Sequence, residues 1–128
     1  MADLVLIDTS VWINLLRGTA QPGQVDHVRK LMQDAQAAWC GMVRLELWAG
    51  VRDERERKQL RALDGTMIDL PVTAKEWTLA ARLADRGRAS GISAPATDLL
   101  IAACSRVHRA KILHDDRHFD LLDKVSLE

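Results

Sequence analysis

The amino-acid sequence predicts an α/β fold with three layers, in which helices cover both faces of a central, mostly parallel sheet. Short apolar runs alternate with longer segments of helical periodicity, which is the pattern of strands joined by helical crossovers. The first run is apolar throughout, as is typical of a parallel strand buried on both faces. No linker or low-complexity segment divides the 128 residues, so we expect one domain over residues 1–128.

Five short segments are the expected strands. The first ends at Asp8, and the third ends at Pro71. The last follows a helix and is expected at an edge of the sheet. The five segments are residues 4–7, 38–42, 67–70, 111–114 and 125–127.

Helices are expected between these strands, because apolar residues there recur every three or four positions. Thr9 and Ser10 can cap the first helix, which runs through Leu16. Thr73 and Glu76 have the spacing of a capping box at the start of the longest one. The other expected helices are residues 24–36, 43–50, 53–63, 73–89, 95–109 and 116–122.

Composition excludes several classes of protein. The 18 basic and 18 acidic side chains cancel, so the net charge gives no global electrostatic signature of nucleic-acid binding. No apolar run approaches the roughly 18 residues that span a membrane, and the start lacks the basic segment of a secretory signal. We therefore expect a cytoplasmic protein without membrane contact. Cys40 and Cys104 lie in apolar segments without a Cys-x-x-Cys spacing and are expected to be buried thiols.

Four acids lie where a site of such a fold is expected, beyond the carboxyl ends of the strands. They are Asp8, Glu46, Asp98 and Asp116. Three of them stand beside strongly apolar segments, where a carboxylate has a desolvation cost unless a partner compensates for it. Carboxylates that converge on one pocket also repel, and a divalent cation relieves both costs. Oxygen ligands alone favour Mg²⁺ or Mn²⁺ over zinc, and such a cation can activate water to hydrolyse a phosphodiester.

Each acid also has a purely structural explanation. Asp8 could simply be the cap of the helix that follows it, and Glu46 could pair with a neighbouring arginine. Asp98 and Asp116 could simply interact with the positive ends of the dipoles of their helices. The position of all four acids at one edge of the sheet is less easily explained in this way.

Four segments, in order along the chain, resemble the motifs of a known family. They are LIDTSVWI at residues 6–13, RLELWAG at 44–50, TDLLIAA at 97–103 and ILHDDRHF at 112–119. They resemble the motifs of PIN-domain nucleases and, more narrowly, of VapC toxins from VapBC toxin–antitoxin pairs. The resemblance implies a PIN-like fold and a metal-dependent endoribonuclease whose acidic quartet is Asp8, Glu46, Asp98 and Asp116. It also implies a homodimer and a cognate VapB-type antitoxin that blocks the acidic groove.

The fourth motif departs from the family pattern. His114 stands where threonine or serine is common, and Asp115 doubles the acid before Asp116. Either of the two could be the fourth acid. Asp116 is preferred because it keeps the spacing to Phe119.

Other residues carry weaker predictions. Ser10 could bind a water on the metal or an RNA phosphate, or it could only cap a helix. Arg52 begins a basic cluster that could hold RNA phosphates or lie on a solvated helix face. Among the histidines, His114 is nearest the expected site and is the candidate for acid or base catalysis. A PIN-fold module that binds RNA or protein without catalysis stays open as the alternative function.

Overall fold

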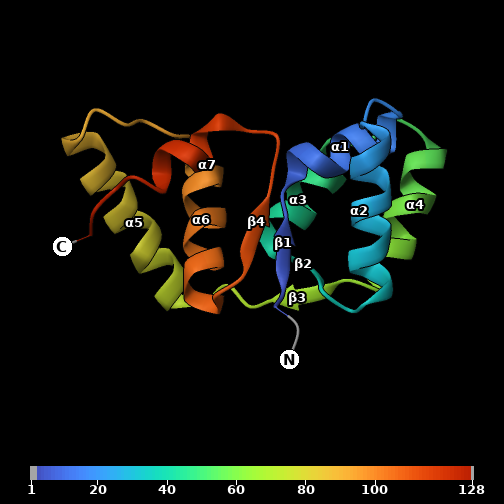
Figure 1. Ribbon diagram of the computed structural model, residues 1–128, viewed down its shortest axis with the longest axis horizontal. Coiled ribbons are helices and arrows are strands. Elements are labelled where there is room, and N and C mark those ends of the chain that lie inside the picture. Colours follow the sequence, from blue (N-terminus) through green and yellow to red (C-terminus); the bar gives the residue numbers. More distant parts are fainter. Residues whose placement is uncertain (1–2, 128) are drawn as a thin grey trace.

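Four parallel strands form the centre of the fold in the computed structural model, which describes residues 3–127 (Figure 1). The strands are β1 (Val5–Ile7), β2 (Ala37–Cys40), β3 (Ile68–Leu70) and β4 (Lys111–Leu113). Their order across the sheet is β3-β2-β1-β4, and all three pairings are parallel. The predicted fold class is confirmed, and the described sheet is wholly parallel.

Helices lie on both sides of this sheet. Figure 1 shows α1, α2 and α4 on one side and α5, α6 and α7 on the other. The seven helices of the described residues are α1 (Thr9–Arg17), α2 (Pro22–Gln33), α3 (Gly41–Ala49), α4 (Glu54–Asp64), α5 (Ala74–Ala89), α6 (Ala96–His108) and α7 (Arg117–Leu122). None of them is long and apolar enough to cross a membrane.

The order of the strands determines where a site can form. The first two crossovers step from β1 to β2 and from β2 to β3, and the third returns across the sheet to β4, beside β1. Because parallel crossovers are right-handed, this reversal puts the last helices on the opposite face. Ligand sites of open α/β sheets lie at such a reversal, beyond the carboxyl ends of the two strands. Here those ends lead into Asp8 and, three residues beyond Leu113, Asp116.

The core explains why the apolar runs fold as predicted. Leu6 and Ile7 of β1 are completely buried, and so is Ile101 in the middle of α6. Cys40 and Cys104 are also buried and free, as predicted. The strand end and the helix start that carry the acids are therefore held by the most buried parts of the chain.

One predicted strand is wrong. Residues 125–127 do not join the sheet, so β4 remains its edge on that side. Instead, Val125 is buried and lies near Gly87 of α5, and the carbonyl of Leu127 accepts a 2.8 Å hydrogen bond from Arg82. A short apolar segment can bury its side chains against a helix as well as against a sheet, and its pattern does not distinguish the two.

The capping box predicted at the start of α5 is present and continues into a buried network. Both the backbone N–H and the hydroxyl of Thr73 donate to the carboxylate of Glu76, at 2.9 and 2.5 Å. The other oxygen of Glu76 lies 3.1 Å from Nε2 of His108, at the end of α6. Glu76 is 2% exposed, so this carboxylate joins two helices inside the protein.

Acid is expected to weaken the fold through Glu76. The hydrogen bond from the Thr73 hydroxyl lowers the pKa of Glu76 against the opposing effect of burial, and His108 lowers it further. A carboxyl whose pKa is lower in the folded state stabilises the fold above its unfolded value near 4.5, and this contribution is lost as the pH falls through the folded pKa. Thermal unfolding between pH 3 and 7 should therefore show a steeper acid loss for the wild type than for Glu76→Gln. The exposed Asp26→Asn variant is the control, and its curve should follow the wild type.

Candidate active site

Asp8 connects the end of β1 to the start of α1. Its backbone N–H donates to the carbonyl of Leu113 at 2.9 Å, which continues the pairing of β1 with β4. Its side chain caps α1, because Oδ2 accepts from the backbone N–H of Ser10 at 3.1 Å and from the Ser10 hydroxyl at 2.7 Å. Asp8, and not Thr9 or Ser10, is therefore the N-cap. It is 3% exposed, so its carboxylate is buried at the sheet edge.

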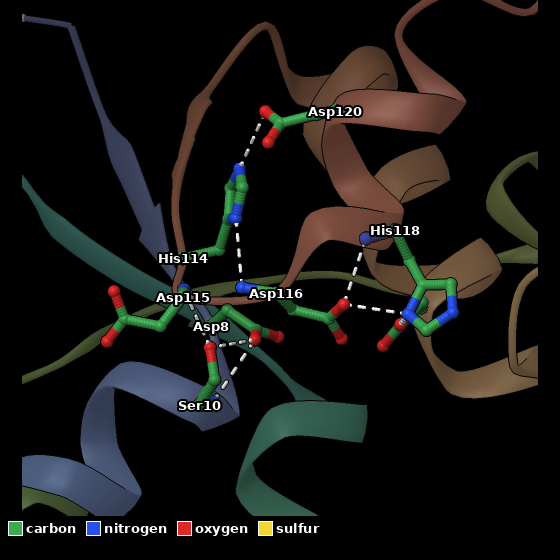
Figure 2. A network of polar contacts seen from close by, with 8 residues as sticks. Asp8, Ser10, His114, Asp115, Asp116, His118 and Asp120 are labelled. Carbon is green, nitrogen blue, oxygen red and sulfur yellow. Dashed lines mark hydrogen bonds and ion pairs between the residues drawn. The ribbon is translucent and has the colours of Figure 1, made fainter.

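Ser10 links the two strands that meet at this edge. Its hydroxyl donates to Asp8 and accepts the backbone N–H of Asp115 at 3.0 Å (Figure 2). The loop after β1 and the loop after β4 are thus held together by one side chain. The structure places Ser10 between the carboxylate of Asp8 and the backbone of Asp115.

Asp98 and Asp116 meet beside the ring of His118. Ligand atoms of these three side chains all lie within 4.8 Å of one another. Asp116 caps α7, and its Oδ1 accepts from the backbone N–H of His118 at 2.9 Å and lies 2.7 Å from Nδ1 of the ring. Asp98, in the first turn of α6, is 7% exposed, and its Oδ2 has no hydrogen-bond partner among the described residues. Nδ1 of His118 lies 3.4 Å from this oxygen.

The electrostatics of this pair are unusual. Burial raises the pKa of Asp98 to about 7, and the nearby carboxylates of Asp116 and Asp8 add to the shift. Burial also acts to raise the pKa of Asp116, but hydrogen bonds from His118 and the one shared with Asp98 hold it below its ordinary value. One acid of the pair is therefore stabilised as a carboxylate, while the other has a buried oxygen that lacks a compensating donor.

Glu46 lies at the same edge, on the other side of Asp8. It is carried by α3, and its Oε1 accepts a 2.8 Å hydrogen bond from the hydroxyl of Thr9. Burial raises the pKa of Glu46, and the charge of Asp8 raises it further, against the effect of the Thr9 bond. Glu46 is therefore electrostatically coupled to Asp8, although it does not belong to the group formed by Asp98, Asp116 and His118.

The adjacent acids Asp115 and Asp116 point in different directions. The carboxylate of Asp115 accepts hydrogen bonds from Asn14 at 3.0 Å and from Gln24 at 3.3 Å. Figure 2 shows it turned away from Asp116. Of the two, only Asp116 lies beside Asp98.

The fourth motif contains two histidines, His114 and His118. The sequence favours His114, but its ring is turned away from the carboxylates of Asp98 and Asp116. Nδ1 of His114 accepts the backbone N–H of Asp116 at 3.2 Å, and Nε2 points toward Asp120 (Figure 2). His118 instead contacts both Asp116 and Asp98. The spacing Asp-x-His at a helix start could have indicated it, because an N-cap side chain lies beside the second residue after it.

The basic cluster has internal partners. Arg52 donates from its backbone and its guanidinium to Glu56, at 3.0 to 3.2 Å, and its side chain is 53% exposed. Arg57 and Arg61 both pair with Glu54 on the same helix. Arg52 therefore does not pair with Glu46, and neither does Arg44, which bonds to Asp64.

Comparison with known proteins identifies the family to which the chain belongs. The family profile described as the PIN domain matches residues 5–125. Two curated relatives are "Ribonuclease VapC11" of Mycobacterium tuberculosis and "VapC ribonuclease Mb1587" of Mycobacterium bovis. Each is 31% identical over 127 residues, which cover 96% of this chain and 94% of the relative.

Solved structures share the fold. VapBC2 from Rickettsia felis, bound to a DNA fragment from its promoter, superposes with a TM-score of 0.78 at 16% identity, over 97% of this chain and 94% of the other. FitAcB from Neisseria gonorrhoeae superposes with a TM-score of 0.71 at 18% identity, over 94% of each chain. At these identities the likeness establishes the architecture alone.

Proposed function

Since the chain belongs to the PIN-domain family and, within it, to the VapC ribonucleases, we propose that it is an endoribonuclease that hydrolyses RNA phosphodiester bonds. It acts as the toxin of a VapBC-type toxin–antitoxin pair, as one PIN domain over residues 1–128. The observation that carries this proposal is the meeting of Asp98 and Asp116 at the edge where Asp8 and Glu46 also lie. These four acids are the catalytic residues of the proposed enzyme.

The donor set supports a hard divalent cation as cofactor. The four acids offer only oxygen ligands, which suit Mg²⁺ or Mn²⁺. Among the described residues, Oδ2 of Asp98 has no hydrogen-bond partner, and burial, together with the nearby carboxylates of Asp116 and Asp8, raises the pKa of Asp98. Asp8, Glu46, Asp98 and Asp116 would hold the cation, which would satisfy this oxygen and offset the repulsion. When bound, it supplies Lewis-acid stabilisation of the phosphate and lowers the pKa of water.

Neighbouring residues of the chain hold the acids in place. Ser10 fixes the carboxylate of Asp8 through its hydroxyl and its backbone N–H. The hydroxyl of Ser10 donates its proton to Asp8. Ser10 therefore affects the substrate through Asp8. Arg52 pairs with Glu56 on one side, and the exposed half of its side chain is free to contact an RNA phosphate.

The proposed partners follow from the family. We infer a homodimer, a cognate VapB-type antitoxin and a cytoplasmic location, which would suit the proposed RNA substrate. A small apolar hollow between α1, α3 and α4 supports an antitoxin contact, because Glu46 is part of its wall. The other lining residues are Ile13, Leu16, Arg17, Leu47, Gly50, Val51, Glu56 and Leu60. A peptide segment that lies across this hollow would also cover Glu46.

The proposed function is tested by RNA cleavage with controlled metal content. Purified protein should cleave RNA in Mg²⁺ or Mn²⁺, lose at least about tenfold of its rate in EDTA, and recover when the cation is restored. Full activity in EDTA would contradict the metal requirement. RNA binding without cleavage in any cation would instead support the non-catalytic binding module.

A further inference from the structure

We propose that His118 is a positioning residue, which orients the carboxylate of Asp116 toward the bound cation through a hydrogen bond from Nδ1. The inference rests on the proposed function, because it assigns a task to a side chain next to one of the proposed metal ligands. His118 does not touch the RNA or the cation in this role, and it acts through Asp116.

In the hydrogen bond between His118 and Asp116, the histidine ring is the donor. Nδ1 of His118 lies 2.7 Å from Oδ1 of Asp116, which is hydrogen-bond distance. A carboxylate that ligates a cation can only accept hydrogen bonds, so Nδ1 of His118 carries the proton and donates it to Asp116. A nitrogen that donates a proton cannot coordinate a metal at the same time. His118 is therefore placed to support Asp116 rather than to be a ligand itself.

Both hydrogen bonds from His118 end on the same oxygen. The backbone N–H and the ring Nδ1 approach Oδ1 of Asp116, at 2.9 and 2.7 Å. Two donors on one oxygen fix the rotation of the carboxylate, and Oδ2 takes part in neither bond. Outer hydrogen bonds of this kind orient ligating carboxylates and commonly contribute a factor of about 10 to 100 in metal affinity.

The ring itself is held in this position. His118 stands in the first turn of α7, where Asp116 is the N-cap and the next residue, Phe119, is 2% exposed in the core. The side chain of His118 is 30% exposed, and Figure 2 shows its second nitrogen pointing away from Asp116. The neighbouring His114 cannot replace it, because its Nδ1 already accepts the backbone N–H of Asp116.

The test is the affinity for Mn²⁺, measured by calorimetry on the protein without RNA. His118→Asn keeps an amide nitrogen near the place of Nδ1, whereas His118→Phe and His118→Ala have no donor. We expect both variants without a donor to bind Mn²⁺ about tenfold more weakly, and His118→Asn to stay within about threefold of the wild type. Wild-type affinity in all three variants would overturn the inference. An equal loss in all three would also overturn it, because the ring nitrogen would then be a ligand.

Thermal unfolding and the variant Asp98→Asn distinguish a failure of the role proposed for His118 from a failure of the proposed function. The thermal midpoint of each His118 variant identifies any loss of binding that comes from loss of the fold, and the two variants without a donor check each other. Asp98→Asn is titrated beside them. If it loses Mn²⁺ while every His118 variant keeps it, the proposed function stands and the role of His118 is wrong. If the wild type binds no cation, the metal requirement and the role of His118 fail together.

Discussion

Replacing Asp98 by asparagine is expected to lower RNA cleavage by at least about 100-fold, in line with the loss of one preorganised charge-stabilising group. Within residues 3–127, Oδ2 of Asp98 is buried without a hydrogen-bond partner, and Asp98 lies close to Asp116. The amide has nearly the same shape but no charge for the cation. The measurement is the initial rate of cleavage of one labelled RNA at saturating Mg²⁺. Activity within a few-fold of the wild type would contradict the proposed site.

The same substitution is expected to stabilise the protein without metal. The pKa of Asp98 in the folded state is raised to about 7, above its ordinary 3.8. The folded state then binds more protons than the unfolded state between these values, so stability falls as the pH rises through this window. Asp98→Asn should therefore have a higher thermal midpoint than the wild type at pH 7 and above, in EDTA, and an equal one below pH 4. A midpoint below that of the wild type at pH 7 would mean that the lost activity reflects a damaged fold.

Asp115→Asn is the matched control for both measurements. It changes the neighbouring acid of the fourth motif, whose carboxylate faces Asn14 and Gln24. We expect cleavage close to that of the wild type. A loss as large as that of Asp98→Asn would mean that Asp115 is the fourth acid of the site.

Replacing Phe119 by alanine is expected to lower the free energy of unfolding by about 3–5 kcal/mol, the usual cost of removing a buried phenylalanine. Phe119 is 2% exposed and is the only phenylalanine of the chain. Its ring packs against His114, with centroids 5.0 Å apart. It therefore anchors the short helix α7, whose cap is Asp116. Urea unfolding followed by circular dichroism gives the value.

The control for this change is an exposed apolar residue. Leu45 is 60% exposed, so Leu45→Ala should change the free energy of unfolding by less than about 0.5 kcal/mol. Phe119→Ala should also weaken Mn²⁺ binding at temperatures where the protein is still folded, since α7 carries both Asp116 and His118. A variant that keeps full stability would show that α7 is held mainly by other contacts.

Much of the fold was predictable because local and tertiary preferences agree. The run before Asp8 is apolar at every position, and a strand covered on both faces buries its consecutive side chains Leu6 and Ile7. The capping box of Thr73 and Glu76 marks a helix start that the structure confirms. The edge that brings the acids together follows from the parallel sheet itself, since strand ends carry whatever follows them to one side.

The remaining features depend on contacts that no local pattern encodes. Residues 125–127 pack against α5 because an apolar surface is available there, and their sequence is equally compatible with a strand. The directions of Asp115 and His114 depend on partners elsewhere in the fold: Asn14 and Gln24 for the acid, and the packing of Phe119 for the ring. Sequence spacing places such side chains near an edge but does not determine where they point.

The bridge made by Ser10 has a consequence for how this nuclease is made. It joins the first turn of α1 to a loop more than 100 positions later, so the acids come together only after β4 has been synthesised. A polypeptide that is still emerging from the ribosome carries Asp8, Glu46 and then Asp98, but its active site is not yet assembled. The order of synthesis therefore delays RNA cleavage until the segment after β4 has left the ribosome and folded against β1.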